Sequence, residues 1–252
     1  IFQPILVRIT RAVIKFMSEI KEEGYIFRSD LRLRPEPSVN PICMSVNFAL
    51  NYYREKGRTW ERSAYIKARP VAGNISKGHT FLADLEPFVW RKKLNYFAIQ
   101  DTQEIRRKIA MKKGNGPQSS ILGFNVKVGS GGIRDIELYT QTLQLIYGGK
   151  DINIRSLGTC ESLQKLREEN RITENILTSL LSAYEFYRKV EHRIQMLNDS
   201  QSHEIPRTEE GKNAIAFLMM MPESKLVYSI TNYRRNVIKI CDAFFSVFSE
   251  EQ

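Results

Sequence analysis

The residues best suited to chemistry lie near the start of the chain, where one aspartate stands among arginines. Asp30 is preceded by Arg28 and followed by Arg32 and Arg34 within residues 25–35. Apolar and charged residues alternate here, which is the period-2 pattern of a strand with one buried face. Side chains on one face of a strand repeat roughly every 7 Å, so a phosphate or a carboxylate-bound metal beside Asp30 would lie near the arginines. The segment predicts either a site for an anionic ligand or a half-buried strand with a solvated charged face, and by itself it slightly favours the second.

A second candidate site is a glycine-rich turn at residues 129–132. It follows a predicted short strand at residues 123–128 and precedes a predicted helix whose first turns carry Arg134, Asp135 and Glu137. In this arrangement backbone amides at a helix N-terminus can meet an anion. The spacing is neither that of a P-loop nor that of a dinucleotide-binding turn. Asp135 and Glu137 point in different directions, so helix capping and compensation of the helix dipole explain the two acids as well.

Composition indicates an ordinary globular protein that attracts anions. The chain has 252 residues, of which 42% are hydrophobic and 26% charged, and a formal net charge of +10. The charge favours nucleotides, nucleic acid or an acidic protein surface as partners. Three cysteines far apart, no signal peptide and no apolar run of about 18 residues favour a soluble protein of the reducing cytoplasm, with no membrane contact.

Helical periodicity dominates the remainder of the chain. The chain has no initiator Met and opens inside a predicted helix, so we expect a fragment of a longer protein. Residues 114–117 are the best candidate linker, and the aromatic residues Trp60 and Tyr65 are expected in the core. Further helices are expected at residues 47–56, 59–69, 80–90, 99–113, 133–147, 156–166, 173–197 and 223–248.

Several of these segments, in this order, resemble one enzyme family. The segments are Arg-Ser-Asp-Leu-Arg-Leu-Arg-Pro at 28–35, Gly-Arg-Thr-Trp-Glu-Arg at 57–62, Ile-Lys-Ala-Arg at 66–69 and Gly-Gly-Ile-Arg-Asp-Ile-Glu at 131–137. Together they resemble glutamine synthetase adenylyltransferase, the bifunctional enzyme that adds AMP to glutamine synthetase and removes it. The segments at 57–62 and 127–134 are more similar to the N-terminal, adenylyl-removing half.

The resemblance implies an α+β, predominantly helical fold. A partial polymerase-beta-like nucleotidyltransferase domain would span residues 1–130, and a helical bundle would span residues 131–252. The implied reaction is attack of phosphate on the adenylyl-tyrosine of glutamine synthetase, which yields ADP and free tyrosine, while adenylylation from ATP belongs to the other half. Implied partners are glutamine synthetase and a nitrogen-status signalling protein, with Mg²⁺ or Mn²⁺ as the metal.

The resemblance also implies roles for individual residues. Asp30 falls at the position of the third metal-binding carboxylate. Arg32, Arg34, Lys67 and Arg69 are implied to contact phosphate or nucleotide. Further residues are expected to line the site or to support it structurally, namely Glu61, Arg62, Gly131, Gly132, Arg134, Asp135 and Glu137.

One departure from the family pattern is large. No Gly-Ser-Asp-x-Asp turn precedes Asp30, and Gly129-Ser130 is followed by two glycines. We expect the missing carboxylate pair to lie upstream in the natural chain, and we expect the 252 residues alone to be inactive because one carboxylate does not hold a metal pair. Two alternatives stay open: a noncatalytic regulatory or protein-binding module of the same fold and, ranked last, a nucleic-acid binder.

Overall fold

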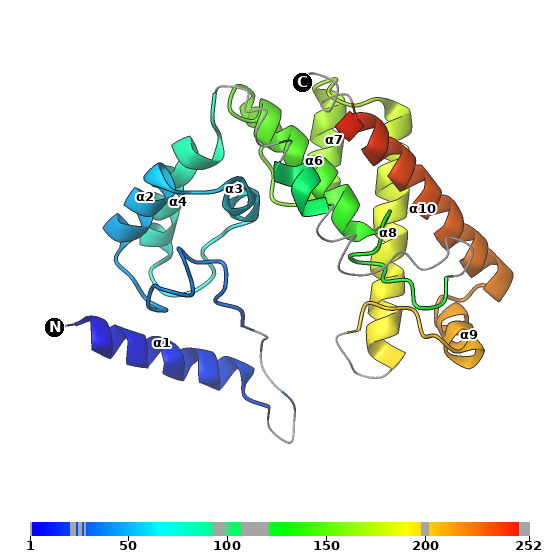
Figure 1. The fold of residues 1–252 in the computed structure, drawn as a ribbon, viewed down its shortest axis with the longest axis horizontal. Helices are drawn as coiled ribbons and strands as arrows, with labels where there is room; N and C mark the ends of the chain where they lie inside the picture. The colour runs from blue at the N-terminus through cyan, green and yellow to red at the C-terminus, as the bar shows by residue number, and fades with distance from the viewer. Residues whose placement is uncertain are drawn as a thin grey trace. The chain divides into compact units, whose positions relative to one another are not determined.

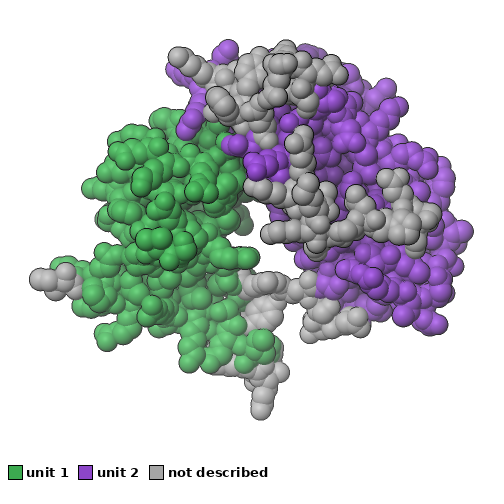
Figure 2. All heavy atoms as spheres, viewed as in Figure 1, with its two compact units in different colours: residues 1–90 green, residues 91–252 purple. Residues whose placement is uncertain are grey.

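The structure, a computed structural model, divides the chain into two compact units. It describes residues 2–20, 24, 27, 29–92, 99, 101–106, 121–197 and 202–246. Unit 1 comprises residues 1–90 and unit 2 comprises residues 91–252 (Figure 2). Residues 121–130, which the sequence assigned to the first domain, pack with the second unit. The predicted end of a nucleotidyltransferase domain at residue 130 stays a prediction.

Unit 1 contains four helices in its described part: α1 (Gln3–Ser18), α2 (Val46–Glu55), α3 (Thr59–Ile66) and α4 (Ile75–Val89). Helices α2 and α3 both pack against α4. Their core contains Tyr53, Ile66, Leu85 and Phe88, with Tyr53 and Phe88 in ring contact at 5.2 Å. Helix α1 buries none of its residues.

The strand predicted at residues 25–35 is wrong in the part that the structure describes. Phe27 is 64% exposed and Leu33 is 62% exposed, so the predicted apolar face is not buried. Residues 29–32 are irregular, and residues 33–40 form bends and turns. An alternating sequence forms a strand only where another strand completes its hydrogen bonds, and no strand of the described residues lies beside this one. The α+β prediction is accordingly corrected to a predominantly helical fold for the described residues.

Unit 2 is a helical bundle built around one central helix, α6 (Ile133–Tyr147). Helices α7 (Thr159–Glu168), α8 (Glu174–Leu197) and α10 (Glu223–Ser246) all contact α6, and α9 (Glu209–Leu218) packs against α8 and α10 (Figure 1). A short 3₁₀ helix, η1 (Ile152–Ile154), leads into α7. The core draws on every one of these elements.

The predicted helix α6 is more deeply buried than its sequence indicated. Its apolar stripe of Ile133, Ile136, Leu143 and Ile146 is buried as expected. Every residue from 136 to 146 is buried as well, including five polar or charged ones. The buried Gln144 amide is hydrogen-bonded: its Nε2 donates to Ile154 O, Ser156 O and Ser162 Oγ at 2.9–3.0 Å. The helix is therefore enclosed on all sides.

Three further expectations need correction. The predicted strand at residues 123–128 is a set of turns with a single bridge between Asn125 and Glu204. Trp60, expected in the core, is 36% exposed. Helix α9 was not predicted as a separate element. The predicted linker at 114–117 and residues 107–113 of the predicted basic helix lie outside the described residues.

Candidate functional site

Asp30 lies on an irregular, solvent-facing segment and is held by the arginine two residues later. Arg32 donates from its backbone N to Oδ1 at 2.9 Å, and from its guanidinium to both carboxylate oxygens at 2.6–3.0 Å. The Asp30 side chain is 45% exposed and the Arg32 side chain 84%. The hydrogen bond to Asp30 raises the pKa of Arg32. The pair is thus formed locally and stays accessible to a ligand.

The other predicted phosphate contacts differ in their availability. Arg34 donates to the backbone oxygens of Leu31 at 2.5 Å and Pro37 at 2.8 Å, so its guanidinium fixes the turn that follows Asp30. Lys67 and Arg69, just after α3, are exposed. The Arg34 guanidinium is therefore bonded to the backbone, whereas Lys67 and Arg69 are exposed to solvent.

Glu61 and Arg62, predicted to line the site or support it, are buried inside unit 1. Glu61 is 3% exposed and accepts hydrogen bonds from Arg58 N at 2.8 Å and from the Tyr52 hydroxyl at 3.3 Å, which caps the start of α3. Burial raises the pKa of Glu61, and those donors oppose the shift without cancelling it. Arg62, 1% exposed, donates to Val89 O at the end of α4. Both residues hold helices together.

The glycine-rich turn does not offer its amides to an anion. The backbone amides of Gly132, Ile133 and Arg134 donate to the oxygens of Gly129, Val126 and Lys127 at 2.8–2.9 Å. Gly131 N donates to Asp135 Oδ2 at 2.8 Å. The chain itself satisfies these amides, and the Asp135 carboxylate that accepts from Gly131 N agrees with the structural interpretation of this segment.

Gly131 and Asp135 instead lock the turn against the last helix. Gly131 has φ +79°, and a Cβ atom there would lie 2.6 Å from Arg234 O on α10. Asp135 also accepts from Arg106 Nε at 3.2 Å, and Arg106 reaches Asp242 of α10 at 3.2 Å. A residue with a side chain at position 131 would thus be strained in its backbone and would push α10 away.

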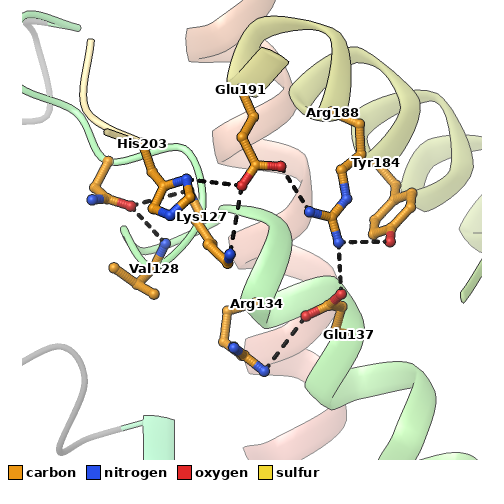
Figure 3. A network of polar contacts seen from close by, with 9 residues as sticks. Lys127, Val128, Arg134, Glu137, Tyr184, Arg188, Glu191 and His203 are labelled. Atoms are coloured by element: carbon orange, nitrogen blue, oxygen red, sulfur yellow. Dashed lines mark hydrogen bonds and ion pairs between the residues drawn. The ribbon is translucent and has the colours of Figure 1, made fainter. Parts of the chain in front are cut away.

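A buried pair of carboxylates forms a charge cluster in unit 2, where α6 meets α8 (Figure 3). Glu137 is 6% and Glu191 3% exposed. Arg188 bridges them, with Nη2 at 2.9 Å from Glu137 Oε1 and Nη1 at 2.7 Å from Glu191 Oε2. Its Nη2 also donates to the Tyr184 hydroxyl at 3.0 Å. We call these residues and the cations described next the α6–α8 ion network.

Three further groups complete the α6–α8 ion network: one from the segment before the glycine-rich turn, one from α6 and one from the segment before α9. Lys127 Nζ lies 3.7 Å and His203 Nδ1 2.9 Å from Glu191 Oε1. Arg134 Nη1 lies 3.6 Å from Glu137 Oε2 (Figure 3). Burial opposes ionisation of Glu191, but Arg188, Lys127 and His203 outweigh it and lower its pKa. The side chains of Lys127 and Arg134 are 31% and 39% exposed, so the network presents cations to solvent above buried acids.

Sequence reasoning placed Arg134 and Glu137 here but missed Lys127, Arg188, Glu191 and His203. Glu191 carried a signal, because it directly follows Val190 on the apolar stripe of α8 and a charge beside such a stripe needs a partner. Nothing local indicated that its partners would come from residues 127 and 203.

A metal centre is not assembled within the described residues. No group of three or more His, Cys, Asp or Glu side chains among them is placed to hold an ion. The described helices also include none that is long and apolar enough to cross a bilayer.

Comparison with known proteins gives two family matches and a set of close relatives. Residues 3–84 match the family described as glutamate-ammonia ligase adenylyltransferase, and residues 101–245 match the family described as GlnD PII-uridylyltransferase. The bifunctional glutamine synthetase adenylyltransferase/adenylyl-removing enzyme of Agrobacterium fabrum is 43% identical over 97% of this chain and 24% of its own length. The enzymes of the same name from Xanthobacter autotrophicus and Bradyrhizobium sp. ORS 278 are 44% and 46% identical over 87% and 83% of this chain, and over 22% and 21% of their own length. The chain spans about a quarter of the length of these curated relatives.

Proposed function

We propose that this chain, which belongs to the glutamine synthetase adenylyltransferase family, forms part of a nucleotidyltransferase acting on glutamine synthetase. Its residues 101–245 also belong to the family described as GlnD PII-uridylyltransferase. Both family descriptions name a nucleotidyl transfer. The observation that carries the proposal is a half-exposed carboxylate, Asp30, beside an exposed arginine in a chain 43% identical to such an enzyme.

Asp30 would serve as a metal ligand and Arg32 as the nearest phosphate contact. The Arg32 guanidinium binds both Asp30 oxygens, so it would have to turn toward a phosphate as the carboxylate turns toward a cation. Both side chains are exposed enough to make that exchange. Lys67 and Arg69 would add positive charge near the nucleotide, whereas Arg34 would shape the turn.

The residues present fit one corner of a divalent-metal site. Asp30 offers carboxylate oxygens, the ligand type that Mg²⁺ and Mn²⁺ prefer. The other carboxylates would come from outside this chain, since the relatives are about four times as long. When bound, such ions stabilise the charge on the attacking and leaving oxygens at phosphorus.

Glu137 and Asp135 would act as supports. Their oxygens are engaged by Arg188, Arg134, Arg106 and the Gly131 amide, which leaves them poorly placed to take a metal. Glu137 would hold Arg134 at the solvent-facing edge of the α6–α8 ion network. Asp135 would hold the glycine-rich turn and Arg106 in place.

Of the two activities in the relatives' name, we propose removal of AMP for this chain. Phosphate would attack the adenylyl-tyrosine bond of glutamine synthetase, with ADP and the free tyrosine as products. The similarity of residues 57–62 and 127–134 to the adenylyl-removing half supports this choice. A nitrogen-status signalling protein as regulator stays a prediction.

The test uses the full-length enzyme that contains this chain, with the substitution Asp30→Asn. ADP release from adenylylated glutamine synthetase and phosphate should fall by about a hundredfold or more, because a metal ligand is lost. AMP incorporation from ATP into unmodified glutamine synthetase should persist. Asp84→Asn, at an exposed aspartate on α4, is the matched control and should leave both assays unchanged.

Each outcome decides one part of the proposal. Retained ADP release in the Asp30→Asn enzyme would refute the metal-ligand role and would favour the noncatalytic alternative. Loss of AMP incorporation with ADP release intact would show that the chain belongs to the other half.

A further inference from the structure

Helices α6, α8 and α10 enclose a pocket that the proposed function does not use. The three helices contact one another (Figure 1), and the space between them has a volume of about 510 Å³ and opens to solvent. Pockets that bind small molecules are roughly 300 to 1,000 Å³. All of its lining residues belong to unit 2, so its shape does not depend on how the two units are arranged.

The floor of the pocket is apolar and partly aromatic. Tyr139 of α6 and Phe244 of α10 meet edge to face, with ring centroids 4.9 Å apart. Ile176 of α8 and Ile240 of α10 pack against the core and line the pocket beside these rings. Such a floor suits a ring or a branched aliphatic group.

The rim of the pocket carries polar side chains whose hydrogen-bonding capacity the described chain does not use. Asn175 and Ser179 come from α8, and Asn236 and Lys239 from α10. None of the four side chains makes a hydrogen bond or an ion pair with another described residue. Lys239 is the one charged residue in the lining, and Asn175 lies in the first turn of α8, where the helix dipole is positive.

The buried edge of the pocket adds one more donor. Tyr139 is 3% exposed, and its hydroxyl has no hydrogen-bond partner among the described residues. Burial raises the pKa of Tyr139, so the hydroxyl stays protonated at neutral pH and can donate to a ligand oxygen.

We propose that this pocket binds a small organic monocarboxylate: an apolar body seated on Tyr139, Phe244, Ile176 and Ile240, and one carboxylate facing Lys239 and the rim amides. A single ammonium with neutral donors matches a single negative charge better than a doubly charged phosphate. The net charge of +10 draws anions toward the surface. The site is independent of Asp30 and of nucleotidyl transfer.

The test measures binding of matched probes to the 252-residue chain by ligand-observed NMR. The probes are 3-phenylpropionate and 4-methylpentanoate, each compared with its neutral amide. The acids should bind more tightly than their amides, and Lys239→Gln should weaken the acids by about fivefold, the upper end for a solvent-exposed ion pair. Lys189→Gln, at an exposed lysine of α8 outside the pocket, should change nothing.

A second variant tests the location without disturbing the core. Ala243 is exposed on α10 and lines the pocket, so Ala243→Phe should fill the space and abolish binding while the unfolding midpoint stays unchanged. The proposal is overturned if neither acid binds, if acid and amide bind equally, or if a folded Ala243→Phe chain still binds the acids.

Discussion

Two buried glutamates, one in each unit, have different kinds of partner: neutral hydrogen-bond donors in unit 1 and cations in unit 2. Glu61 of unit 1 is 3% exposed and receives hydrogen bonds from a backbone amide and a tyrosine hydroxyl. Glu191 of unit 2 is also 3% exposed, but Arg188, Lys127 and His203 face it. The pKa is raised at Glu61 and lowered at Glu191. Burial alone therefore does not fix how a carboxylate contributes to stability; its partners do.

The two glutamates contribute to the stability of their units with opposite pH dependences. The folded pKa of Glu61 exceeds its ordinary value of 4.5, so its contribution is fully present below pH 4.5 and is lost as the pH rises through the folded pKa. The folded pKa of Glu191 lies below 4.5, so its contribution is present above pH 4.5 and is lost as the pH falls through the folded pKa. Unit 1 can be followed separately, because both tryptophans, Trp60 and Trp90, lie in it.

The largest effect is expected from removing the paired acid. Glu191→Ala leaves Arg188 and Lys127 without their shared carboxylate and should destabilise unit 2 by about 3 kcal/mol at pH 7. Denaturant unfolding followed by far-UV circular dichroism should show the shift, with tryptophan fluorescence unchanged. Glu185→Ala, at an exposed glutamate of the same helix, is the control; equal losses in both variants would contradict an effect of pairing.

A backbone substitution should have the next largest effect. Gly131→Ala adds a Cβ at φ +79° and 2.6 Å from Arg234 O, and should cost about 2 kcal/mol in unit 2. Gly73→Ala, at φ +74° with nothing within 4 Å, should cost unit 1 only about 1 kcal/mol, the backbone strain alone. Gly131→Ala is followed by circular dichroism and Gly73→Ala by tryptophan fluorescence. If both variants lost the same free energy of unfolding, the close approach of α10 to Gly131 would contribute nothing to the cost.

Removing the unpaired charge should have a smaller effect. Glu61→Gln keeps an oxygen that accepts from Arg58 N, so the fluorescence-detected stability of unit 1 should change by less than about 1 kcal/mol at pH 7. The decline of that stability as the pH rises above 4.5 should become shallower. A steeper decline in the variant would show that Glu61 is not the titrating group.

The smallest effect on stability is expected from breaking the ion pair between Arg32 and Asp30. Arg32→Gln removes an exposed pair, so the fluorescence-detected unfolding midpoint should stay where it is. The same change should weaken ADP release by the full-length enzyme, as a contact to phosphate would require. A shifted midpoint with normal ADP release would make Arg32 a structural residue.

The sequence predicted the helices of unit 2 well where the apolar period was long. Residues 173–197 were expected as one helix, and α8 spans Glu174–Leu197. Its apolar residues recur at helical spacing, namely Ile176, Leu180, Tyr184, Tyr187, Val190, Ile194 and Leu197. Helix α9 was missed although Thr208 caps it and Glu209 and Glu210 open it, because its apolar set is short. The strand at 25–35 is not formed in its described part, because no described strand lies beside it to complete its backbone hydrogen bonds.

The sequence identified some residues of the candidate site, but it did not predict which residues they contact. The motif at 131–137 drew attention to Asp135 and Glu137, and their separation in direction was foreseen. Their partners Arg106 and Arg188 lie 29 and 51 residues away in sequence, a distance at which periodicity and capping patterns carry no information. Tertiary packing alone brings them together.

The full enclosure of α6 has a consequence for how the chain is made. Residues 133–147 leave the ribosome about a hundred residues before the end of α10, which covers them. At roughly 5 to 20 residues per second, the face of α6 that packs against α10 stays uncovered for about 5 to 20 seconds. During that interval this face of α6 is open to chaperones, and pausing between α6 and α10 would lengthen its exposure.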